Sequence, residues 1–104
     1  MTQVKAPIPK LVRIGQKKYS IEVVEAMLEK SWQGSVAYGP QRIKIARTSN
    51  VSGRPFADHE MQATFWHEIT HAILYDMGNK LYKNEAFVGE FANRLAQAIK
   101  TARF

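Results

Sequence analysis

Two histidines and a glutamate at helical spacing are the residues of this sequence best suited to chemistry. Residues 67–71 read His-Glu-Ile-Thr-His, so the histidines are four positions apart. Because an α-helix turns about 100° per residue, His67 and His71 would lie on one face and could reach one metal ion. Glu68 lies beside the first histidine and could accept a proton from a water molecule at that ion. The pattern therefore predicts His67 and His71 as metal ligands and Glu68 as the catalytic base.

The residues on both sides of this pattern are uncharged, over positions 64–66 before it and 72–75 after it. A helix with such flanks is expected to be buried, where polar side chains need partners to offset their desolvation. The alternative is that His67 and His71 are ordinary core or edge histidines and that Glu68 points to solvent. A shared metal ion would satisfy all three side chains together, and we favour that interpretation.

The sequence contains no cysteine. Disulfides and thiolate-bound structural zinc sites are therefore excluded. Any metal ion must be held by histidine, aspartate or glutamate, which is the ligand set of catalytic zinc. We expect Zn²⁺ as the cofactor, held by three protein ligands and one water molecule.

The third ligand is expected from an acid that follows the first helix. Asp76 would lie about 140° round that helix from His71, so it faces away. Glu85 falls in the first turn of a second predicted helix, where the helix dipole also favours an ordinary acid. Glu90 would lie about 140° round from Glu85. We predict Glu85 as the ligand, with Glu90 as the alternative, because Glu85 shares its face with an apolar stripe that should pack on the first helix (Val88, Ala92, Leu95, Ala96 and Ile99).

The elements that must position these residues begin with two predicted hairpins. In the first, β-branched residues 11–14 and 19–24 flank the turn 15–18; in the second, residues 35–38 and 42–46 flank Gly39-Pro40-Gln41. Residues 25–32 are ambiguous, because several of them favour helix. The hairpins predict a small antiparallel or mixed sheet.

Two helices are predicted to follow the sheet. The active-site helix would run over about 59–77, with Asp58 as its N-cap and Gly78-Asn79 as its stop. The glutamate helix would run over about 85–101, capped by Asn84. Strands followed by helices indicate an α+β fold in a single domain, residues 1–104, in which residues 1–10 form a loose N-terminal arm.

Charge and hydropathy restrict the partners. Lys and Arg number 15 against 9 Asp and Glu, a formal charge of +6, but the basic residues are scattered and no DNA-reading motif accompanies them. We therefore expect a solvated surface rather than a nucleic-acid partner. Because no apolar run has the length of a signal peptide or a membrane helix, we expect a cytoplasmic protein with no membrane partner. The sequence leaves the oligomeric state open.

The metal motif and the second helix together resemble a known group. His67 to His71, followed by Asn84-Glu85-Ala86-Phe87, resembles the gluzincin zinc peptidases, whose third ligand is a glutamate on a separate helix; Asn-Glu-Ala opens that helix in the thermolysin family. The short chain is similar to minimal gluzincins and to the phage-associated ImmA/IrrE-like proteins, in which a short sheet precedes the same two helices. The similarity is specific over about residues 64–96. It implies a zinc metallopeptidase that hydrolyses a protein or peptide.

The resemblance also implies where a substrate would lie. Residues 42–46 would be the edge strand of the cleft, and Ile43, Lys44 and Ile45 would pair with an extended substrate. Two positions depart from the families. Gly89 stands where gluzincins often carry an acid that orients a histidine, and Phe91 stands where the ImmA/IrrE-like group has a glutamate before Ala-Asn.

Two questions remain open at this point. The donor that would stabilise an oxyanion could be Tyr38, Tyr75 or Tyr82, and the sequence does not rank them. The scaffold could also bind a partner or a metal ion without turnover, as a regulator of phage type.

Overall fold

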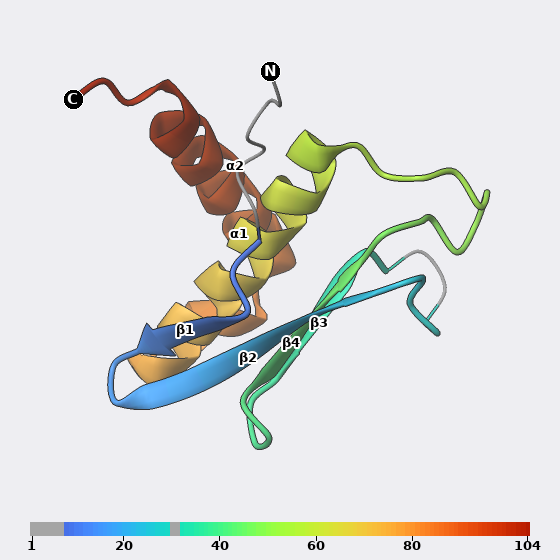
Figure 1. The fold of residues 1–104 in the computed structure, drawn as a ribbon. Coiled ribbons are helices and arrows are strands. Elements are labelled where there is room, and N and C mark those ends of the chain that lie inside the picture. The colour runs from blue at the N-terminus through green and yellow to red at the C-terminus, as the bar shows by residue number, and fades with distance from the viewer. Residues whose placement is uncertain (1–7, 30–31) are drawn as a thin grey trace.

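The structure, a computed structural model, describes residues 8–29 and 32–104. Four strands precede two helices: β1 (Leu11–Ile14), β2 (Lys17–Val24), β3 (Gly34–Ala37), β4 (Arg42–Ala46), α1 (Asp58–Asp76), the 3₁₀ helix η1 (Lys80–Lys83) and α2 (Glu85–Thr101). Helix α1 packs on the sheet, and α2 packs on α1 (Figure 1). The predicted α+β class, with a small mixed sheet followed by two helices, is confirmed.

The four strands form one sheet in the order β1-β2-β4-β3. Both hairpins are antiparallel, and the parallel pair β2–β4 joins them. Strand β4 is therefore an inner strand with a partner on each side. The prediction that residues 42–46 form the edge strand is wrong, and β3 occupies that edge instead.

The first hairpin closes through Gly15 and Gln16, so that Ile14 faces Lys17. Gly15 has φ 61°, a left-handed conformation that glycine adopts without steric cost. Glycine at the first turn position is typical of tight two-residue hairpins. Strand β2 consequently starts at Lys17, two residues earlier than the sequence predicted.

The core lies between the sheet and α1. Alternate residues of β2 and β4 point to the helix, so Tyr19, Ile43 and Ile45 have no exposed surface and meet Phe65 and Ile69 of α1. Burying the isoleucine side chains among them is worth about 1.5–3 kcal/mol each. This packing fixes the rotation of α1, and with it the direction in which the side chains of residues 67, 68 and 71 point.

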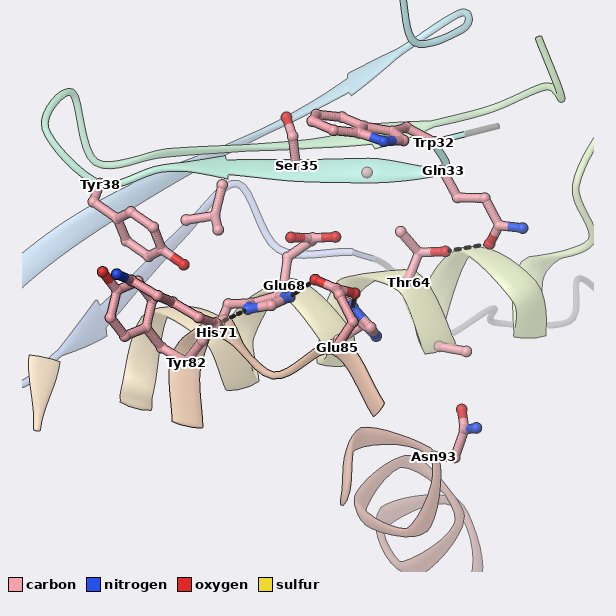
Figure 2. Close-up of a pocket in the computed structure, with 15 residues that line it drawn as sticks. Trp32, Gln33, Ser35, Tyr38, Thr64, Glu68, His71, Tyr82, Glu85 and Asn93 are labelled. Carbon is pink, nitrogen blue, oxygen red and sulfur yellow. Dashed lines mark hydrogen bonds and ion pairs between the residues drawn. The ribbon is translucent and has the colours of Figure 1, made fainter. Parts of the chain in front are cut away.

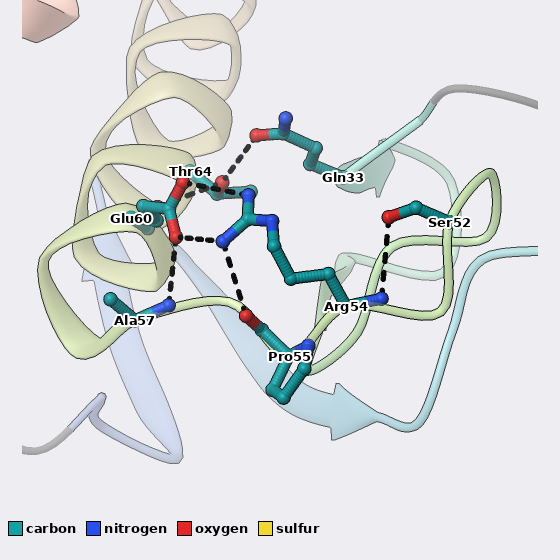
Figure 3. A network of polar contacts seen from close by, with 7 residues as sticks. All are labelled: Gln33, Ser52, Arg54, Pro55, Ala57, Glu60 and Thr64. Carbon is teal, nitrogen blue, oxygen red and sulfur yellow. Dashed lines mark hydrogen bonds and ion pairs between the residues drawn. The ribbon is translucent and has the colours of Figure 1, made fainter.

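The start of α1 is held by the side chain of Glu60 rather than by Asp58. Ala57 is the N-cap residue and Asp58 is the first helical residue. The Ala57 N–H donates to Glu60 Oε1 at 2.8 Å, while both carboxylate oxygens of Glu60 also accept from Arg54 at 3.1 Å (Figure 3). The prediction of Asp58 as N-cap is therefore off by one residue, because Glu60 satisfies the free backbone donor.

The segments outside the sheet and the helices differ in part from the sequence predictions. Residues 25–29 form bends rather than helix, and Met27 among them is buried. Of the predicted N-terminal arm, residues 1–7 lie outside the described residues, whereas Ile8 packs against the core. In the part of the chain that the structure describes, neither helix is apolar enough over a sufficient length to cross a membrane.

Candidate metal centre

Helix α1 presents His67, Glu68 and His71 toward one cleft. The imidazole rings of His67 and His71 lie 4.9 Å apart between centroids, at an interplanar angle of 65°. His71 and Glu68 are buried, and His67 is partly exposed. The four-residue spacing thus places both imidazoles side by side on the helix, as the sequence predicted.

Glu85 reaches this pair from the start of α2. The side chain of Asn84 accepts the Phe87 N–H at 3.0 Å and so starts α2 at residue 85. Val88 and Ala92 are buried, which turns the same helix face toward α1. As a result Glu85 Oε1 lies 3.0 Å from His67 Nε2, and Glu85 Oε2 lies 2.8 Å from His71 Nε2 (Figure 2).

The three side chains form a group that could hold a metal ion. One ligand atom from each of His67, His71 and Glu85 lies within 4.8 Å of the others. Glu90 does not take part, because it pairs with Arg94 at 3.4 Å on the exposed side of α2. Asp76 lies against Gly15, on another side of α1.

The surroundings of His71 test whether a cation fits here. Nδ1 faces the Tyr82 carbonyl oxygen at 2.6 Å, and Nε2 faces the Glu85 carboxylate at 2.8 Å. A neutral imidazole has only one N–H and cannot donate to two acceptors. With its N–H directed at Tyr82, the neutral ring turns an unprotonated Nε2 toward the Glu85 carboxylate, and this donor set suits a divalent cation held between them.

The Tyr82 carbonyl is a functional group that the sequence did not indicate. It accepts the Nδ1 proton of His71 and so leaves Nε2 as the nitrogen directed at Glu85. Metal-binding histidines usually donate their second N–H to such an acceptor. Gly89 has no side chain that could orient a histidine. For His71, the backbone carbonyl of Tyr82 in η1 takes that role instead.

Glu68 lies largely buried beside the group, at the wall of the cleft. Its side chain is buried, with a residue exposure of 7%. Burial raises the pKa of its carboxyl to about 8, and the nearby Glu85 carboxylate adds to the shift. A cation held by the neighbouring ligands would favour the charged carboxylate, which is the form that accepts protons.

A cleft of about 730 Å³ opens over these residues. Its walls include strand β3 and both Tyr38 and Tyr82, whereas Tyr75 is not among the lining residues. Burial and the nearby Glu68 carboxylate raise the pKa of Tyr38 to about 12, so its phenol remains a hydrogen-bond donor at neutral pH. Of the three tyrosines considered as oxyanion donors, Tyr38 and Tyr82 line the cleft and Tyr75 does not.

The predicted substrate-binding residues lie elsewhere. Ile43 and Ile45 are fully buried in the core, and Lys44 is exposed on an inner strand whose backbone pairs with β2 and β3. Ile43, Lys44 and Ile45 therefore offer no free strand edge to an extended chain, and that prediction is wrong. The strand that lines the cleft is β3, from Gly34 to Ala37.

Comparisons with protein-family models, with curated proteins and with solved structures gave no match. The function must therefore be inferred from the residues themselves. Those residues are a two-histidine, one-carboxylate group, a buried glutamate beside it and an open cleft with a strand along one wall.

Proposed function

We propose that this chain is a zinc-dependent metallopeptidase of the gluzincin type. The observation that carries the proposal is the convergence of His67, His71 and Glu85 beside the buried Glu68. Two imidazoles and one carboxylate are a frequent ligand set of catalytic zinc and leave a position for water. Glu85 is 73% exposed at its side chain, so the group is reachable from solvent.

When bound, zinc would lower the pKa of a water molecule to about 7 and polarise a carbonyl group. Glu68 accepts the proton of that water as its oxygen forms a bond to the carbonyl carbon of the substrate. When the C–N bond breaks, Glu68 passes the proton to the leaving amine nitrogen. The protein returns to its starting state, and the products are a carboxylic acid and an amine.

Tyr38 serves as the donor to the developing oxyanion. Its phenol lines the cleft, and burial raises its pKa to about 12, so it stays protonated even well above neutral pH. A neutral donor held by packing stabilises negative charge that appears in the transition state. Ring stacking on Tyr75, with centroids 4.1 Å apart, limits the movement of Tyr38.

An extended peptide is the substrate that suits the cleft. The Ala46 N–H donates to the Gln33 carbonyl at 2.8 Å, which places the pairs Ser35–Lys44 and Ala37–Arg42 in hydrogen-bonded register. The backbone groups of Gly34 and Val36 then point to the free edge, since antiparallel pairs alternate. A peptide that adds to this edge lies along the wall of the metal centre.

The proposal is tested on protein purified without chelator or nickel affinity. Wild type should contain about one zinc per chain and cleave a mixture of unstructured peptides, with products read by mass spectrometry. Glu68→Gln should retain zinc and lose activity by about 10²–10⁴-fold, the usual contribution of a general base. Glu90→Gln is the matched control, because Glu90 is an exposed acid directed away from the metal group.

Two results would contradict the proposal in different ways. Cleavage by Glu68→Gln at the wild-type rate would remove Glu68 as the base, and wild type without zinc would remove the metal site. Stoichiometric zinc with no peptide cleaved would favour the alternative, a zincin-like scaffold that binds a partner or a metal without turnover.

A further inference from the structure

Three tyrosines from separate segments form one aromatic cluster behind the metal group. Tyr38 follows β3, Tyr75 lies near the end of α1, and Tyr82 lies in η1. Tyr38 stacks on Tyr75 at 4.1 Å between ring centroids, and Tyr82 meets both rings edge-on at 5.5 and 5.2 Å. Aromatic pairs at such distances attract each other beyond the area that they bury. The cluster therefore ties η1 to α1 and to the end of β3.

The segment η1 has few other anchors. None of its residues is buried, and Tyr82 alone among them is partly buried. Its local hydrogen bonds, Leu81 N–H to Asn79 Oδ1 at 2.9 Å and Asn84 N–H to the Leu81 carbonyl at 2.9 Å, shape the turn without joining it to α1. The Tyr82 ring thus attaches η1 to α1 through the ring of Tyr75.

The Tyr82 backbone in turn determines the state of His71. Its carbonyl accepts the Nδ1 proton of His71 at 2.6 Å, so Nε2 is directed at Glu85. His67 differs, since within the described part of the chain no hydrogen bond to its Nδ1 is formed. A change in η1 would therefore act on the Nδ1 side of His71, where His67 has no corresponding contact among the described residues.

We propose that Tyr75 is a positioning residue for the metal ligand His71. It does not line the cleft, but its ring holds that of Tyr82, and the Tyr82 carbonyl holds His71 in the tautomer that leaves Nε2 for the metal. Tyr38 is less suitable for a test, because it also lines the cleft. This role depends on the proposed zinc site, and it names the contacts that orient His71 as one of the zinc ligands.

The test measures zinc affinity by competition with a chelator and the ring tautomers by ¹H–¹⁵N NMR. In Tyr75→Ala we expect zinc to bind about tenfold more weakly, at the lower end of the range for outer-shell partners. The Nδ1–H signal of His71 should broaden or disappear, while the ring carbon-bound proton signals of His67 are unchanged. Tyr75→Phe keeps the ring and should behave as wild type.

The control is Phe56→Ala. Arg54 lies over the Phe56 ring at 5.5 Å, as Lys17 lies over the Tyr75 ring at 5.5 Å, and Phe56 is outside the cleft lining. This variant should leave both histidines and the zinc affinity unchanged. Wild-type affinity and an intact His71 signal in Tyr75→Ala would overturn this inference alone. Equal changes at His67 and His71 would show a general loss of structure and also overturn it. Wild type that binds no zinc would overturn the proposed function, and this inference with it.

Discussion

Gly34 of β3 and Thr64 of α1 approach so closely that no side chain fits between them. A Cβ atom on Gly34 would lie 2.6 Å from Thr64 Cγ2 and 2.9 Å from the Lys44 carbonyl oxygen, with Glu68 Cγ at 3.3 Å. Strand β3 is therefore in close contact with the turn of α1 that carries Glu68, the proposed catalytic base. This contact sets the width of the cleft between the strand and the metal group.

Gly34→Ala should consequently destabilise the fold and disturb the site. One added methyl group in a closely packed position costs about 1–3 kcal/mol. We expect a lower midpoint of urea unfolding and, because β3 must move away from Glu68, a lower kcat/KM for peptides. Gly39→Ala is the matched control, since nothing lies within 4 Å of a Cβ there. An effect of equal size at Gly39 would refute the steric explanation.

Removal of Glu85 should weaken zinc binding far more than removal of Glu90. Glu85 lies 3.0 and 2.8 Å from the two histidine Nε2 atoms, whereas Glu90 pairs with Arg94. We expect Glu85→Ala to raise the Kd for zinc by more than about 100-fold, beyond the usual effect of an outer-shell partner. Glu90→Ala should change it little. Chelator competition on both variants decides between the two acids, and equal losses would exclude Glu85 as a specific ligand.

Position 89 offers a way to strengthen the site. A Cβ on Gly89 would lie 3.9 Å from His67 Cε1, an ordinary contact, so a side chain there faces His67. Gly89→Asp should supply an acceptor for His67 and lower the Kd for zinc by about tenfold. Gly89→Ala, the control, should leave the Kd unchanged and stabilise α2 by about 0.5–1 kcal/mol. If the two variants bind zinc equally well, His67 gains nothing from the carboxylate.

The start of α1 should make stability depend on acid pH. Hydrogen bonds from Arg54 and from the Ala57 N–H lower the pKa of Glu60 from 4.5 to about 2 in the folded protein. Because the folded value is the lower one, this stabilisation is complete above pH 4.5 and is lost as the pH falls toward 2. Urea unfolding of Glu60→Gln should therefore show a lower midpoint than wild type at pH 7 and a shrinking difference below pH 4.5.

Arg54→Gln should reproduce this behaviour, because it removes the same interaction from the other side. A difference between wild type and Glu60→Gln that stays constant down to the lowest pH would show that the charge of Glu60 does not matter.

The local features of this protein could be read from its sequence. Spacing alone places His67 and His71 on one helix face, and the strong cap signal of Asn84 gave the start of α2. The choice of Glu85 over Glu90 also follows from local periodicity, since Val88 and Ala92 mark the face that packs on α1. Such inferences depend on neighbours within one or two turns, which the sequence displays directly.

The order of the strands could not be read in this way. Alternation in residues 42–46 indicates one buried face, and it is the same whether a strand lies inside a sheet or at its edge. The parallel pairing of β2 with β4 joins residues about twenty positions apart through backbone atoms that every residue carries. Only that long-range pairing made β3, rather than β4, the wall of the cleft.

The sequence by itself determined the types and spacing of the candidate metal ligands and of the glutamate beside them, because these reside in side chains on single helices. The tertiary structure alone decided what orients His71, since the acceptor is the backbone carbonyl of Tyr82. Every residue has such a carbonyl, so no pattern of residue types singles one out. Its selection depends on where η1 lies on α1, and three aromatic rings distant in sequence hold it there.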